Sequence, residues 1–342
     1  MTFSDQSSKR QWAPTCCLQS LKARAEAYAR IRSFFQERKV LEVETPLLGS
    51  STATDPFLAS VTASLSLSSG QPGRQFFLHT SPEFPMKRLL AAGSGAIYQI
   101  CKTFRDGESG KRHNPEFSML EWYRPGFSLS QLMSEVAELV IRVLGIEGLQ
   151  IKHLSYREAF NQYLGIDPFS ASDEQLRQMA EQKTGIVSSE QDAVPLNRDD
   201  YLNLLLTSCI EPELGAEGNG SPALCFLSGY PASQASLARL AEDEYGQLVA
   251  ERFELYIQGL EIANGYFELT DAQEQARRFQ QDNDQRKQMG LPQIPPDQHL
   301  LDALTVGLPA CSGVALGLDR LLMIKLQTNT IEDVISFPVE RV

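Results

Sequence analysis

The sequence predicts an α+β fold in which a mainly antiparallel sheet is flanked by helices. Three stretches carry this prediction. Residues 21–38 have the apolar spacing of an amphipathic helix and run into the strand-like segment LEVETPLL. Residues 104–123 form two strand patterns joined by a long polar loop, which indicates a β-hairpin. Residues 312–324 form a glycine-punctuated apolar strand that continues into a helix.

The loop of the predicted hairpin is rich in hydrogen-bond donors. Its donor side chains are Arg105, Lys111, Arg112, His113 and Asn114. A rigid sheet can hold such donors in place around an anionic ligand. A solvated hairpin loop is the plainer alternative for this cluster taken alone. Residues 312–324 favour a ligand-binding role for this loop, because they offer a second cation beside a strand of small residues.

That strand carries Gly313, Ala315 and Gly317, whose small side chains let a flat ligand approach the backbone. Arg320 follows at the start of the helix and supplies a planar cation. The two stretches together therefore predict a site for an anionic, partly planar molecule.

Composition limits the class of protein. The chain has 342 residues with 42% hydrophobic content, enough for one large domain or two ordinary ones. The net charge is −12 without a Lys/Arg run, so extended nucleic-acid docking is not expected. No apolar run suits a bilayer and the N-terminus lacks a signal-peptide pattern, which indicates a cytoplasmic protein. The six cysteines show no CxxC pair, so free thiols are expected.

Along the chain we expect a flexible N-terminal segment at residues 1–17 and one catalytic domain at 18–342. The acidic stretch at about 170–220 is predicted to be a helical insertion within that domain. The remaining expected elements are a strand at 76–80 and helices at 86–92, 129–144, 155–164, 172–183 and 199–210.

A further chemical pattern lies at residues 253–269, which are predicted to be one long strand. It carries Glu254, Glu261 and Glu268 at intervals of seven. Seven is odd, so bulges at Gly259 and Gly265 would be needed to bring the carboxylates to one face. Glu254 and Glu261 are candidate ligands for Mg²⁺ beside ATP phosphates, and Glu268 is a candidate partner for a cationic substrate. Solvated acids on an exposed strand are the alternative.

The three opening stretches resemble motifs 1, 2 and 3 of the class II aminoacyl-tRNA synthetases, in that order, and most closely those of the lysyl branch. The resemblance covers residues 21–342 and implies the class II catalytic fold, with a homodimer formed through motif 1. It also implies that a carboxylate attacks the α-phosphorus of ATP to give an aminoacyl-adenylate. A carboxylate is already ionised at neutral pH, so positioning and charge stabilisation should carry the rate.

The resemblance also assigns roles residue by residue. Arg105 and Arg320 would be the catalytic cations, and Glu254 and Glu261 the metal ligands. Matching the motifs assigns ATP binding to Arg105, Asp106, Gly107, His113, Asn114, Phe117, Glu261, Ile262, Gly317 and Arg320. It assigns amino-acid binding to Ser81, Pro82, Glu83, Tyr123, Asn264, Glu268 and Ala315.

Two positions depart from the family pattern. Gly107 stands where motif 2 usually has an adenine-reading glutamate, and Glu108 is the nearest substitute. Ala315 stands where the lysyl branch has glycine. One added methyl group in a tight pocket can shift which amine is accepted, by about 1–3 kcal/mol.

The sequence before residue 21 is too short for the five-stranded barrel with which lysyl-tRNA synthetases read the anticodon. A lysyl-type core without that barrel resembles protein ligases that activate (R)-β-lysine and attach it to a lysine of elongation factor P. ATP and Mg²⁺ are then expected, with no tRNA or membrane partner. A free-standing synthetase-like enzyme acting on tRNA or a small molecule, and a non-catalytic regulatory paralogue, are the alternatives. The sequence leaves open whether the substrate is α- or β-lysine.

Overall fold

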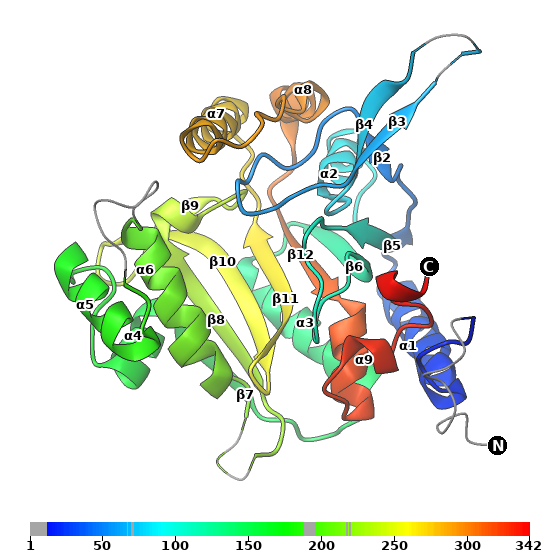
Figure 1. Ribbon diagram of the computed structural model, residues 1–342. Coiled ribbons are helices and arrows are strands. Elements are labelled where there is room, and N and C mark those ends of the chain that lie inside the picture. The colour runs from blue at the N-terminus through cyan, green and yellow to red at the C-terminus, as the bar shows by residue number, and fades with distance from the viewer. Residues whose placement is uncertain (1–11, 67, 70–71, 188–195, 217, 219) are drawn as a thin grey trace. The chain divides into compact units, whose positions relative to one another are not determined.

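The computed structural model describes residues 12–66, 68–69, 72–187, 196–216, 218 and 220–342 (Figure 1). The chain divides into two compact units. The first unit comprises the chain up to Gly126 together with Glu138–Ile146 and Thr270–Val342. The second unit comprises Phe127–Ala137 and Glu147–Leu269. The helix α3 (Leu129–Leu144) supplies residues to both, and its bounds match the predicted ones.

The first unit is built on four neighbouring strands in the order β1-β5-β6-β12. Their bounds are β1 Leu41–Glu42, β5 Ile97–Phe104, β6 Glu116–Pro125 and β12 Cys311–Gly317. The β5–β6 and β6–β12 pairs are antiparallel, and the short β1 runs parallel to β5. A small antiparallel sheet in the order β2-β4-β3 consists of Leu48–Gly49, Arg74–Leu78 and Thr62–Leu65. The antiparallel pair β5–β6 confirms the predicted motif 2 hairpin.

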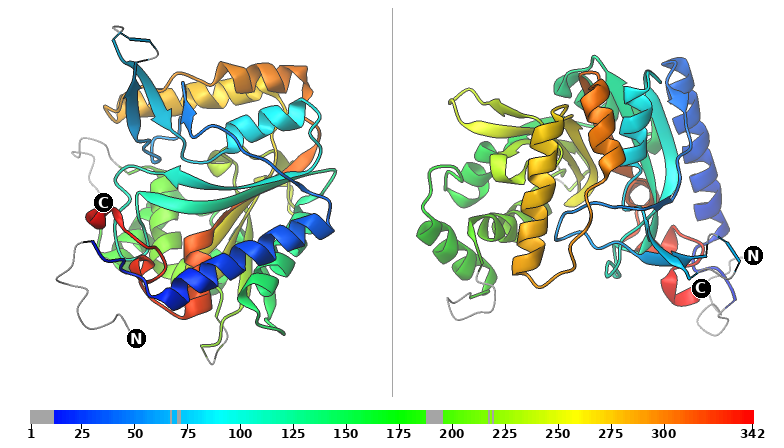
Figure 2. Two further views of the ribbon diagram at one scale, coloured as in Figure 1. Left: turned by 90° about the vertical axis from the view of Figure 1, so that its right-hand side faces the viewer. Right: turned by 90° about the horizontal axis from the view of Figure 1, so that it is seen from above.

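Helix α1 (Leu18–Glu37) lies along these strands, as Figure 2 shows, because its aromatic side chains reach them. The ring of Phe35 stacks on Tyr98 with centroids 4.3 Å apart and meets the edge of Trp122 at 5.5 Å. The apolar face predicted for residues 21–38 is buried at Ile31, Phe34 and Phe35 but not at its start. Leu21 is 37% exposed, whereas Ala23 and Ala27 are buried.

The remaining helices of the first unit are α2 Glu83–Ala91, α7 Ala272–Gln288, α8 Gln298–Gly307 and α9 Leu318–Leu326. Helix α8 packs against both α2 and α7. Helix α2 begins three residues before the predicted start, so Glu83 lies in its first turn. A carboxylate there complements the partial positive charge of the helix N-terminus.

The second unit has its strands in the order β11-β10-β8-β7, with β9 on β10. Their bounds are β7 Ile151–Ser155, β8 Leu224–Pro231, β9 Leu240–Glu242, β10 Leu248–Ile257 and β11 Leu260–Phe267. The β7–β8 pair is parallel and the others are antiparallel. Its core includes Tyr156, Phe160 and Leu205, which are fully buried.

The helices of the second unit begin where the sequence offers caps. They are α4 Tyr156–Leu164, α5 Asp173–Thr184 and α6 Arg198–Leu205. Ser155, Ser172 and Asn197 each form a capping box, which satisfies backbone donors that the first turn leaves unpaired. The predicted helix at 199–210 is too long, because α6 ends at Leu205 and residues 206–210 form a π-helical turn.

The prediction of one long strand at 253–269 is wrong. The segment is the hairpin β10–β11, with Ile257 opposite Leu260 and Gln258-Gly259 as a two-residue turn. Both turn residues have positive φ (50° and 68°), as a type I′ turn requires. Gly259 is needed because a Cβ there would lie 3.0 Å from the Cα of Pro212. Gly259 is therefore a turn residue and not the expected bulge.

All six cysteines are free thiols, as predicted. Among the described residues, no helix has the length and apolar character needed to cross a bilayer. Most of the predicted flexible segment, residues 1–11, lies outside the described residues, as do 188–195, 217 and 219 of the predicted insertion. The extent of the catalytic domain stays a prediction.

Candidate active site

The β5–β6 hairpin of the first unit holds Arg105 over an aromatic ring. Phe104 pairs with Glu116 at the end of the ladder, and the N–H of Arg105 donates to the carbonyl of Pro115 at 2.9 Å. The guanidinium carbon lies 5.1 Å from the centre of the Phe117 ring. The Nε–H of Arg105 is buried and has no hydrogen-bond partner among the described residues. A ligand anion would satisfy this donor.

The loop that follows, residues 105–115, is a compact tip that we call the nucleotide loop. Gly110 and His113 bridge it with reciprocal backbone hydrogen bonds of 3.1 and 3.2 Å. Gly107 adopts φ +78° with open space around it, so the turn itself demands glycine there. Asp106 donates its N–H to the carbonyl of Ala59.

His113 connects the nucleotide loop to motif 3. An Nη2–H of Arg320 donates to Nε2 of His113 at 2.5 Å, which places the histidine proton on Nδ1. Partial desolvation and the adjacent Arg320 cation lower the pKa of His113, so the neutral ring is favoured. The arrangement presents Arg320 from the first turn of α9 as a fixed cation.

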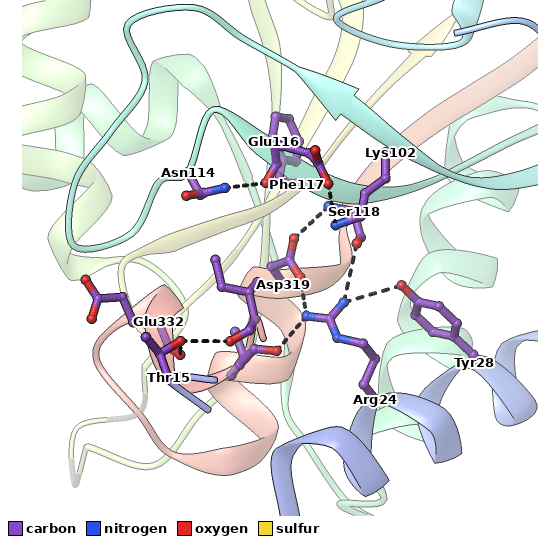
Figure 3. A network of polar contacts seen from close by, with 12 residues as sticks. Thr15, Arg24, Tyr28, Lys102, Asn114, Glu116, Phe117, Ser118, Asp319 and Glu332 are labelled. Carbon is purple, nitrogen blue, oxygen red and sulfur yellow. Dashed lines mark hydrogen bonds and ion pairs between the residues drawn. The ribbon is translucent and has the colours of Figure 1, made fainter. Parts of the chain in front are cut away.

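The pairing of β12 with β6 fixes which motif 2 residue lies opposite each motif 3 residue. Gly317 lies opposite Met119, and Ala315 lies opposite Glu121. Just beyond, Asp319 is buried and accepts the N–H of Ser118 at 2.6 Å. Asp319 also forms an ion pair with Arg24 of α1 (Figure 3). The three predicted motifs thus meet in one polar network.

The predicted amino-acid-binding residues of the first unit surround a buried carboxylate that sequence reasoning missed. Glu121 is 2% exposed and accepts from Ser81 Oγ at 2.7 Å and from Tyr123 Oη at 2.6 Å. Ser81 Oγ in turn accepts the N–H of Glu83 at 3.0 Å. The signal was available, because Glu121 is a lone acid within the apolar run MLEWY.

Glu83 is also tied to a buried lysine. The Nζ of Lys87 donates to Glu83 Oε1 at 2.6 Å, one helical turn away, and the lysine side chain is only 1% exposed. A buried ammonium requires such a partner. The first unit therefore holds two carboxylates, Glu83 and Glu121, in fixed positions on neighbouring elements.

The second unit carries its own polar cluster on one face of β10 and β11. Glu254 is 7% exposed and accepts from Tyr230 Oη at 2.7 Å and from Asn264 Nδ2 at 3.1 Å. Arg252 forms an ion pair with it, and Tyr256 donates a further hydrogen bond. A metal ion would compete with all four donors, so Glu254 fits poorly as a magnesium ligand in this arrangement.

The described residues contain no group of three or more acidic, histidine or cysteine side chains suited to a metal. Glu261 is half-buried and faces Tyr256 across the ladder, so its predicted role as a ligand stays a prediction. Asn264 keeps a buried Oδ1 that accepts no hydrogen bond from the described residues. Glu268 is 1% exposed. Acceptors of this kind suit an ammonium group.

These features are those of a class II synthetase catalytic core, and the family comparison agrees. The model of the class II tRNA synthetases (D, K and N) matches residues 14–341, so the chain belongs to that family. Among its relatives is the elongation factor P–(R)-beta-lysine ligase of Salmonella paratyphi B, which is 48% identical over 96% of this chain and 98% of the relative. The proteins of the same name from Salmonella schwarzengrund and Salmonella agona match to the same extent.

Replacing Glu121 with alanine should destabilise the first unit, because two buried hydroxyl groups lose a charged acceptor. We expect the free energy of unfolding to fall by about 2–4 kcal/mol in urea titrations. Glu116→Ala on the same strand is the control. Its side chain is 52% exposed and pairs with Lys102 at 3.3 Å, so a loss of about 0–1 kcal/mol is expected. Equal losses in both variants would contradict this account of Glu121.

Stability should also fall in mild acid because of His79, two residues before Ser81. Its Nε2 donates to the carbonyl of Lys102 at 2.6 Å, and its buried Nδ1 has no partner among the described residues. Burial lowers the pKa of His79 from the ordinary 6.5. As pH falls below 6.5, His79 takes up a proton in the unfolded chain but not yet in the folded chain. The folded state therefore loses stability until pH falls below the folded pKa of His79.

We expect the free energy of unfolding of the wild type to decrease as pH falls from 6.5. In His79→Gln, which keeps a donor for Lys102, this decrease should be smaller. Chemical denaturation at a series of pH values measures both slopes. Identical slopes in the two proteins would show that His79 does not supply the effect.

Proposed function

We propose that this protein is an ATP-dependent ligase that activates (R)-β-lysine and transfers it to the ε-amino group of a lysine on elongation factor P. The observation that carries the proposal is the 48% identity, over 96% of the chain, to relatives that bear that name. Membership in a family of ATP-using synthetases supports the activation step.

In the first half-reaction, a carboxylate oxygen of the amino acid attacks the α-phosphorus of ATP, and pyrophosphate leaves. Arg105 would hold the α-phosphate, because its guanidinium combines a buried, unsatisfied donor with a position over the Phe117 ring. Adenine would stack on Phe117. Arg320, oriented by His113, would take the terminal phosphates, with Asn114 and the Gly317 backbone close to the nucleotide. The motif match also assigns Asp106 and Gly107 and, in the second unit, Ile262 to ATP binding.

In the second half-reaction, the deprotonated ε-amine of the acceptor lysine attacks the adenylate carbonyl. An amide bond forms, AMP leaves with the electron pair of the broken C–O bond, and the amine releases its proton. The ammonium groups of the substrate require carboxylate or neutral oxygen acceptors. From the motif match alone we propose Glu83 and Tyr123 of the first unit for this role and, separately, Asn264 and Glu268 of the second. Ser81, Pro82 and Ala315 would shape the pocket.

Family membership implies magnesium with ATP. We keep Glu261 as the proposed magnesium ligand on the motif match alone, while the four donors on Glu254 argue for a structural role of that residue. A cytoplasmic location accords with the substrates proposed and is part of the proposal.

The test is ATP–pyrophosphate exchange with α-lysine and both enantiomers of β-lysine, followed by transfer of label to elongation factor P or to bulk tRNA. We expect exchange to be strongest with (R)-β-lysine and the label to appear on the protein. Arg105→Gln should lower exchange by about 100-fold, because a charge-stabilising contact is lost. Arg112→Gln is the control, since it removes an exposed cation of the same loop.

Label on tRNA would overturn the proposal in favour of a synthetase acting on tRNA. No exchange with any of the three amines would favour a non-catalytic paralogue. Equal effects of Arg105→Gln and Arg112→Gln would remove the assigned role of Arg105 but leave the activity itself in place.

We also propose that the protein is a homodimer through the motif 1 region. Helix α1 leaves Leu18 and Leu21 exposed by 55% and 37%, and Leu41 on the short strand β1 is 57% exposed. Leu41→Glu should shift the protein to a monomer in analytical ultracentrifugation, whereas Leu248→Glu, at 44% exposure in the second unit, should not. A wild-type monomer at micromolar concentration would contradict the proposal.

A further inference from the structure

The last part of the chain lies against the nucleotide loop. We propose that residues 331–341, which we call the C-terminal clasp, position this loop for ATP through Asn114. The inference rests on the proposed function for its kinetic consequence, but its structural consequence can be measured without activity.

The clasp contacts the nucleotide loop at three separate points. The N–H of Ile331 donates to the carbonyl of Lys111 at 2.9 Å. The N–H of Val339 donates to Oδ1 of Asn114 at 2.9 Å. Ser109 Oγ donates to Glu340 Oε1 at 3.2 Å. The contacts come from both short helical turns of the clasp, η5 Ile331–Asp333 and η6 Val339–Arg341.

Asn114 is the contact that matters most for a ligand. Its side chain is buried, with 6% exposure, and its Nδ2 donates to the carbonyl of Glu116 at 2.6 Å. Because Oδ1 accepts from Val339, both ends of the carboxamide are held and the group cannot flip. Glu116 begins strand β6, so the clasp links this loop residue to the rigid sheet.

The clasp is itself anchored on the side away from the loop. Thr15 Oγ1 donates to the carbonyl of Glu332 at 2.9 Å, and Arg24 donates to the carbonyl of Val334 at 2.7 Å (Figure 3). Ile331 and Val334 are buried, with 3% and 1% exposure. These anchors involve other atoms than the loop contacts do. The loop contacts can therefore be removed while the clasp stays in place.

The same Arg24 forms the ion pair with Asp319 and donates to Ser118 Oγ at 3.4 Å. One guanidinium thus holds the clasp, the start of α9 and the strand that leads from the nucleotide loop. We assign Arg24 as a positioning residue and Val339 as the donor that transmits its effect to Asn114.

Val339→Pro tests the inference because it deletes one N–H. Pro338 has φ −68° and ψ 167°, the extended conformation that a following proline prefers, and proline is tolerated at the first residue of a helical turn. Val339→Ala keeps the N–H and is the matched control. Loss of one hydrogen bond to a buried acceptor should raise KM for ATP by up to about tenfold, with kcat within about twofold.

The second measurement is amide hydrogen–deuterium exchange of residues 105–115. We expect faster exchange in Val339→Pro than in the wild type or Val339→Ala, with unchanged exchange in α1. Ser109→Ala, which removes a clasp contact from the loop side, should change KM for ATP in the same direction but less.

The outcomes separate this inference from the proposed function. An active wild type whose KM for ATP and loop exchange are unaltered in Val339→Pro would overturn the clasp. A wild type without ATP–pyrophosphate exchange would defeat the proposed function, and the hydrogen-exchange comparison would then decide the clasp alone. A merely structural role would lower kcat or stability in both Val339 variants without a selective change in KM for ATP, and that result would also overturn it.

Discussion

The ion pair between Arg24 and Asp319 is the constraint on which the first unit depends. Asp319 is almost fully enclosed, with 3% of its side chain exposed, and Arg24 retains 18%. A carboxylate in such a place is stable only while its partner and hydrogen bonds remain, and removing one partner typically costs about 3–5 kcal/mol. Loss of either partner alone would therefore destabilise the fold, unlike loss of an exposed surface pair.

The pair and its hydrogen bonds join helix α1, strand β6 and helix α9 at one point. The backbone N–H of Ser118 and the carbonyl of Val334 complete the hydrogen bonds of the pair, and each belongs to a different segment. Arg320 follows Asp319 directly in the chain, so this network also fixes the position of its backbone. If the proposed nucleotide site is correct, these distant segments hold it in place before a ligand binds, which would lower the cost of organising it during the reaction.

The sequence predicted those features that depend on local pattern. The bounds of α3, the motif 2 hairpin and, to within one residue, the extent of α4 follow from periodicity. The contacts of the C-terminal clasp could not be predicted, because a backbone donor such as that of Val339 leaves no trace in residue type. Glu121 was missed although an acid in an apolar strand is a visible anomaly, since its partner Ser81 lies 40 residues earlier, in the connection between β4 and α2.

The segment 253–269 is not one long strand, but two of its carboxylates, Glu254 and Glu261, still lie on one face of the sheet, as predicted. In a regular hairpin with Glu254 opposite Asn264, Glu261 would lie opposite Ile257 and point to the other face. The ladder instead pairs Leu255 with Ala263 and Tyr256 with Glu261, so Ile262 is an extra residue on β11. This single bulge returns Glu261 to the face of Glu254 and Asn264. A turn at Gly259 and one bulge at Ile262 therefore place Glu254 and Glu261 on the same face, where bulges in one long strand were expected to do so. The spacing of seven between Glu254 and Glu261 thus fits a hairpin with one bulge. The extra backbone residue, Ile262, sets the face of the sheet on which Glu261 lies.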